Sequence, residues 1–101
     1  MNRKERRQKA RAAKNRGNKV NHHGVLAEQL FNQGKIEDAI SAFQRAVKSD
    51  KSYVQGWFNL GVLYNQTGKG EEAVKSYKKA ISIKPDYSEA YYSLGNALKE
   101  Q

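Results

Sequence analysis

The stretch Trp57–Pro85, WFNLGVLYNQTGKGEEAVKSYKKAISIKP, decides the fold, because its pattern of letters occurs again on both sides at a spacing of 34 residues. Its small and large letters recur upstream, where Ala39, Phe43 and Ala46 correspond to Ala73, Tyr77 and Ala80. Its aromatic, leucine and glycine letters recur downstream, where Tyr91, Leu94 and Gly95 correspond to Trp57, Leu60 and Gly61. A period of this length indicates a chain built from stacked copies of one supersecondary unit.

This pattern resembles the tetratricopeptide repeat (TPR) from about Val20 to the end of the chain. The resemblance implies an all-α fold, a helix-turn-helix solenoid of about two and a half repeats and five helices, preceded by a basic N-terminal arm. Each repeat pairs a first helix, helix A, with a second, helix B, and the pairs stack into a right-handed superhelix.

The repeat register divides the chain into four segments. Residues 1–19 form a basic arm, helical or disordered, and residues 20–53 form a degenerate first repeat. Residues 54–87 carry the full consensus, and residues 88–101 form helix A of a third repeat or a capping helix. A helix A is normally covered by a helix B, so we expect further repeats or self-association through the face of this last helix.

Local signals predict how the helices begin, end and approach one another. Gly34 and Gly68 follow successive A helices and are expected to end them in the left-handed conformation. The spacing Ser52-x-x-Gln55 predicts a capping box at the start of the second repeat. Gly61 is expected to let helix B approach helix A closely.

The net charge of +9 belongs almost entirely to the arm. Residues 1–19 hold nine Lys or Arg against Glu5, whereas the remaining residues hold ten basic and nine acidic side chains. Dense positive charge attracts phosphate through counterion release, which predicts salt-sensitive, non-specific contact with nucleic acid or anionic lipid heads. The candidate phosphate contacts are Arg3, Lys4, Arg6, Arg7, Lys9 and Arg11.

Composition argues against several other classes of protein. The absence of cysteine excludes disulfides and thiolate metal sites, and no apolar run approaches the roughly 20 residues that span a bilayer. The start of the chain lacks the apolar core of a secretory signal, so we expect a cytoplasmic protein. His22 and His23 are adjacent and would point about 100° apart on a helix, which makes them poor co-ligands. We therefore expect no catalytic, cofactor or metal site and no enzyme activity.

In the family that the chain resembles, the A helices line a concave groove that binds extended peptides or partner helices. Phe58 and Tyr92 occupy equivalent positions in this register, which predicts an aromatic pair along one wall. Side-chain amides between them can donate to and accept from a peptide backbone. The candidate groove residues are Gln55, Phe58, Asn59, Val62, Asn65, Gln66, Glu89, Tyr92, Ser93 and Asn96.

Two subclasses of the family can be compared with these positions. Domains that clamp the C-terminal carboxylate of chaperones use cations where this sequence has Glu28 and Glu89, so we expect no binding of chaperone tails. The run that begins at Tyr91 is similar to repeats that precede the catalytic domain of O-linked N-acetylglucosamine transferases and related bacterial proteins. No sugar-nucleotide or transferase motif occurs in these residues.

The favoured hypothesis is a protein–protein interaction module that binds a partner peptide or helix, of unknown identity, in the groove. A first alternative is the N-terminal, substrate-recruiting segment of a larger enzyme, such as an O-linked N-acetylglucosamine transferase-like protein. A second alternative is a nucleic-acid or ribosome-associated adaptor that acts through the basic arm.

Overall fold

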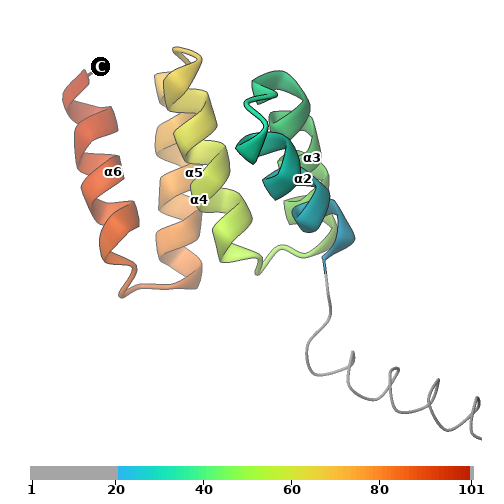
Figure 1. The fold of residues 1–101 in the computed structure, drawn as a ribbon. Helices are drawn as coiled ribbons and strands as arrows, with labels where there is room; N and C mark the ends of the chain where they lie inside the picture. Colours follow the sequence, from blue (N-terminus) through green and yellow to red (C-terminus); the bar gives the residue numbers. More distant parts are fainter. Residues whose placement is uncertain (1–20, 101) are drawn as a thin grey trace, which may run out of the picture.

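The computed structural model describes residues 21–100, and this part of the chain folds into five α-helices joined by short turns (Figure 1). The basic arm of residues 1–19 and its candidate phosphate contacts lie outside the described residues. The helices are α2 (His22–Asn32), α3 (Ile36–Ser49), α4 (Val54–Gln66), α5 (Gly70–Ile83) and α6 (Ser88–Glu100). The all-α fold and the five helices expected from the repeat register are confirmed.

The turns within the first two repeats have the same geometry. Gly34 and Gly68 adopt φ angles of 75° and 76°, as expected for glycines that end a helix in the left-handed conformation. After each glycine the backbone N–H reaches back five residues: Lys35 donates to the carbonyl of Leu30 at 2.9 Å, and Lys69 donates to that of Tyr64 at 2.8 Å. These bonds use carbonyls that the end of a helix leaves without partners, so both glycines define a sharp, satisfied helix end.

The predicted capping box at Ser52 and Gln55 is wrong. Helix α4 begins at Val54, so its cap position is Tyr53, and no side chain caps it. Ser52 instead donates its hydroxyl to the Asp50 carboxylate at 2.7 Å, and its backbone N–H donates to the same oxygen at 3.1 Å. The acidic side chain two residues earlier captures these groups first, as aspartate commonly does in turns.

The helices form two layers, with α2, α4 and α6 in one layer and α3 and α5 in the other (Figure 1). We call the outer surface of the first layer the A-face and that of the second layer the B-face. Between the layers, a first core cluster centres on Phe43, Leu60 and Leu63, which are at most 2% exposed. A second cluster joins Tyr77 on α5 to Ala97 on α6. Each repeat therefore buries its apolar residues against the next one.

Gly61 makes the closest approach between α4 and α5. A Cβ atom built on Gly61 would lie 2.5 to 2.8 Å from three ring carbons of Tyr77, well inside van der Waals contact. The equivalent residue of the third repeat, Gly95, has no atom within 4 Å of such a Cβ, because no described helix covers that side of α6. The same repeat letter thus has a packing role at one position and open space at the other.

The outermost helices expose apolar side chains whose equivalents inside the stack are covered. Leu26 on α2 is 49% exposed, whereas its counterpart Leu60 is 2% exposed. On α6, Tyr91 and Leu98 are each 50% exposed, although their counterparts Trp57 and Tyr64 are half-buried. Further repeats or self-association through α6 stay a prediction.

We predict opposite effects for two substitutions of equivalent glycines. Gly61→Ala should lower the free energy of unfolding by about 1 to 3 kcal/mol, because the added methyl group overlaps the Tyr77 ring. Gly95→Ala should raise it by about 0.5 to 1 kcal/mol, because alanine loses less backbone entropy in a helix and nothing obstructs it. Urea unfolding followed by circular dichroism measures both, and equal effects would show that the close approach at Gly61 has no energetic weight.

Candidate functional site

The predicted groove residues of α4 form one stripe on the A-face. Gln55, Asn59, Val62 and Gln66 are four, three and four residues apart, a spacing that keeps side chains on one side of a helix. Gln55 and Gln66 are exposed, and Asn59 and Val62 are half-buried. The middle of the stripe is therefore partly sheltered by neighbouring side chains.

A chain of hydrogen bonds orients the amides of this stripe. Gln55 Nε2 donates to Asn59 Oδ1 at 3.3 Å, and the Tyr87 hydroxyl donates to Gln55 Oε1 at 3.4 Å. Tyr87 lies just before α6, so these bonds link α4 to the helix that stacks beside it. The amide N–H groups of Asn59 have no partner among the described residues and face solvent in part, so they can donate to a ligand.

The expected aromatic pair along one wall is not formed. Phe58 is half-buried and packs against Tyr77 and Tyr87, with ring centroids 5.8 and 5.1 Å away. Tyr92, the equivalent residue on α6, is 74% exposed. Phe58 fills the junction between α4, α5 and α6, whereas nothing in the described part of the chain packs on Tyr92 in the same way. Only Tyr92 offers an open aromatic surface.

The other predicted groove residues differ in how accessible they are. Val62 packs against the second core cluster, and Ser93 is half-buried. Asn65 lines a cavity of about 420 Å³ between the turn after α4 and the end of α6, where Glu100 also lies. Glu89, Asn96 and Gln66 are exposed. The structure thus leaves amide and acidic groups open on the A-face and uses most of the apolar candidates for packing.

Sequence reasoning missed two tyrosines that join successive A helices. A Cβ built on Gly24 or Gly56 would lie within 2.9 Å of the Tyr53 ring, so both glycines make room for it. Tyr87, 34 residues later, fills the next junction against Phe58 and Ala90. Their recurrence at the last position of each repeat was visible in the sequence and could have identified them as junction residues.

Tyr53 also makes a polar contact on the A-face. Its hydroxyl donates to Glu28 Oε1 at 3.1 Å. Burial raises the pKa of Tyr53 to about 12, and the negative charge of Glu28 and this hydrogen bond act in the same direction. Burial likewise raises the pKa of Tyr87, with a smaller contribution from the charge of Glu89. The protonated phenols therefore belong to the folded state.

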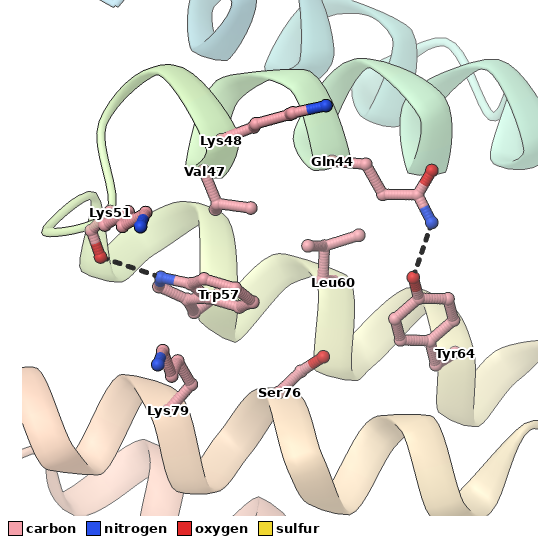
Figure 2. Close-up of a pocket in the computed structure, with 9 residues that line it drawn as sticks. All are labelled: Gln44, Val47, Lys48, Lys51, Trp57, Leu60, Tyr64, Ser76 and Lys79. Atoms are coloured by element: carbon pink, nitrogen blue, oxygen red, sulfur yellow. Dashed lines mark hydrogen bonds between the residues drawn. The ribbon is translucent and has the colours of Figure 1, made fainter.

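A second hollow lies on the B-face, and nothing in the sequence pattern predicted it. This B-face cavity of about 370 Å³ lies between α3 and α5, with α4 as its floor (Figure 2). Val47, Trp57 and Leu60 supply apolar surface, and Lys48, Lys51 and Lys79 lie around it. None of the nine lining residues, all in the described part of the chain, carries a carboxylate.

Neither a metal cluster nor a membrane-spanning helix was found in residues 21–100. This part of the chain contains no group of three or more His, Cys, Asp or Glu side chains that could hold a metal ion. Its helices are also too short and too polar to cross a bilayer. His22 and His23 are both exposed on α2.

Comparison with known families finds a match over most of the chain. The family model described as TPR repeat matches residues 27–68 and 63–101. A comparison with curated proteins finds no match.

Solved structures with the same fold include two crystal structures of MamA, 33% and 34% identical, each with a TM-score of 0.74. They match 77% and 76% of this chain, which spans 46% and 42% of theirs, or less than half. The second TPR of Spaghetti (RPAP3), bound to the HSP90 peptide SRMEEVD, is 28% identical with a TM-score of 0.73. That match covers 76% of this chain and 71% of the RPAP3 chain.

We predict that Tyr53 titrates near pH 12 and that Glu28 sets part of this value. A phenol whose pKa is raised by folding stabilises the fold below its ordinary pKa of 10.0, and this stabilisation disappears as the pH rises towards 12. The tyrosinate absorbance of the chain minus that of Tyr53→Phe should therefore rise near pH 12. Glu28→Gln should move this step to lower pH, because it removes both the charge and the charged acceptor. A difference step at pH 10 would show that Tyr53 is not held by the fold.

Proposed function

The chain belongs to the tetratricopeptide-repeat family, and we propose that it is a protein-interaction module whose A-face binds an extended peptide of a partner protein. The observation that carries this proposal is the oriented row of amides at Gln55 and Asn59, held by Tyr87 at the junction with α6. An extended peptide has a free donor and acceptor at every residue, and such amides can pair with both. The RPAP3 structure, a peptide complex with the same fold, supports a role in peptide binding.

The charge of the A-face suggests which peptides it accepts. Helices α2, α4 and α6 carry Glu28, Glu89 and Glu100 against a single lysine, Lys99. The peptide bound to RPAP3, SRMEEVD, has three acidic side chains. Like charges facing each other weaken binding, so we propose that the A-face of this chain takes neutral or basic extended segments rather than acidic tails.

Selection from a random decapeptide library displayed on phage tests this proposal. We expect selected peptides to bind the chain, and Asn59→Ala/Tyr92→Ala/Asn96→Ala to weaken that binding at least about tenfold, because it removes two amides and the exposed ring. Arg45→Ala/Lys75→Ala/Lys78→Ala is the matched control, since it changes three exposed residues of the B helices. Isothermal titration calorimetry with synthetic peptides gives the affinities. If the first variant binds as tightly as the control, the A-face is not the binding surface.

The two alternatives stay predictions of the sequence. Recruitment of a substrate to a larger enzyme is compatible with a chain that spans less than half of the MamA structures it resembles. An adaptor role for the basic arm concerns residues outside the described part of the chain. Both are separable from peptide binding by the A-face.

We predict that any binding of nucleic acid depends on the arm and on salt. A fluorescent 20-nucleotide RNA should bind the whole chain at about 0.05 M NaCl and lose most of its affinity at about 0.2 M, because the contacts are with phosphates. Deletion of residues 1–19 removes a net charge of +8, nine Lys or Arg less Glu5, and should abolish binding. Fluorescence anisotropy measures both effects. Binding that survives the deletion would assign the contact to the repeats instead.

A further inference from the structure

The B-face cavity, defined above by its place between α3 and α5, has a size and a shape suited to one bulky side chain. Its volume of about 370 Å³ lies at the lower end of the range for ligand pockets, roughly 300 to 1,000 Å³. Figure 2 shows Lys48 and Gln44 on the α3 wall, Ser76 and Lys79 on the α5 wall, and Trp57, Leu60 and Tyr64 along α4. The cavity lies on the opposite layer from the amide row, so it is separate from the proposed peptide site.

The floor of the cavity is apolar and fixed in position. Val47 and Leu60 are 5% and 2% exposed, and the half-buried Trp57 covers one end. The Trp57 indole N–H donates to the carbonyl of Lys51 at 3.0 Å, which fixes the ring plane (Figure 2). At the other end Gln44 Nε2 donates to the Tyr64 hydroxyl at 2.7 Å. Because both ends are held by hydrogen bonds, an apolar group can enter with little loss of side-chain entropy.

The rim of the cavity is positively charged. Lys48 comes from α3, Lys51 from the following turn and Lys79 from α5, so cations surround the floor on several sides. The Lys79 ammonium lies 5.8 Å from the centre of the Trp57 ring, which places it at the cavity mouth. The acidic residues of α3 and α5 are in their first turns, at the far ends of these helices from Lys48 and Lys79. The cavity therefore has a local positive charge that carboxylates would complement.

The repeat pattern does not require this charge. One repeat later, the positions of Lys48 and Lys51 hold Ser82 and Pro85. Pro85 is the ordinary closing residue of the repeat, and Lys51 replaces it without any change in helix length, since α3 and α5 are both 14 residues long. The fold forms equally well with an uncharged residue at each place, so the two lysines are additions to the scaffold.

We propose that the B-face cavity binds an acidic segment of a partner protein, with one bulky apolar side chain seated between Val47, Trp57 and Leu60. Carboxylates on both sides of that anchor would pair with Lys48, Lys51 and Lys79. The buried Ser76, 4% exposed, presents its hydroxyl to the cavity and can donate to a backbone carbonyl of the segment. This proposal does not depend on peptide binding by the A-face.

The test uses the whole chain and the synthetic peptide GSEDFDEGS, in which one phenylalanine lies between two acidic pairs. Trp57 is the only tryptophan of the chain, so its indole N–H signal in a ¹H–¹⁵N NMR spectrum reports on this cavity alone. We expect the peptide to shift that signal and the indole fluorescence. Replacing the phenylalanine by glycine, or raising NaCl from about 0.05 to about 0.5 M, should each weaken binding at least about threefold.

Two charge-reversed variants separate the cavity from general electrostatic attraction. Lys48→Glu/Lys51→Glu/Lys79→Glu should weaken binding at least about tenfold, because the rim then repels the carboxylates. Lys35→Glu/Lys75→Glu/Lys78→Glu makes the same change in net charge at exposed positions that do not line the cavity, and should weaken it far less. Circular dichroism establishes that both variants keep their helices.

Three outcomes would overturn the proposal. The first is an absence of binding at millimolar peptide. The second is binding that leaves the Trp57 indole signal unmoved, which would place the peptide elsewhere on the chain. The third is equal weakening by the two charge-reversed variants, or a Trp57 shift with dodecanoate but not with the peptide, which would indicate a small amphiphile as the ligand.

Discussion

The whole stack depends on how closely the two helices of a repeat approach each other, and the contact of Gly61 with the Tyr77 ring sets that distance. With no Cβ on Gly61, the ring lies directly on the backbone of α4. That approach brings Leu60 and Leu63 into the first core cluster, where both are at most 2% exposed. In the first repeat Ala27 and Phe43 occupy the same two positions and are fully buried. A smaller partner ring without a hydroxyl accompanies the extra methyl group there, so the volume of the pair is kept.

The second constraint is the junction between successive A helices, which determines what the A-face exposes. Tyr53 fills the first junction beside Gly24 and Gly56, and Tyr87 fills the second beside Phe58. Because Phe58 takes the place that Gly24 leaves empty, the second junction packs an extra ring. That ring is drawn into the core and is lost to the A-face. The hydroxyls of both tyrosines stay near the surface, where they bond Glu28 and Gln55.

The two layers of the solenoid end up with different chemistry. The A-face presents amides and carboxylates, whereas lysines surround a cavity with an apolar floor on the B-face. The helix macrodipole accounts for part of this separation, since the acidic residues of α3 and α5 lie in their first turns, where negative charge is favourable. It does not account for Lys51, which lies in a turn. Two chemically distinct faces would allow one small scaffold to hold two different segments at once.

The sequence by itself determined the period, the helices and their ends. A spacing of 34 residues, glycines after two A helices and small residues facing large rings are local properties, so they can be interpreted without knowing what packs against what. It also placed Gln55, Asn59 and Asn96 on the A-face, because helical spacing fixes direction. Tertiary structure alone decided that Phe58 is packed while Tyr92 is open, that Asp50 rather than a capping box holds Ser52, and that Lys48, Lys51 and Lys79 meet around one cavity. Those outcomes depend on contacts between residues far apart in the chain, and no repeat letter specifies them.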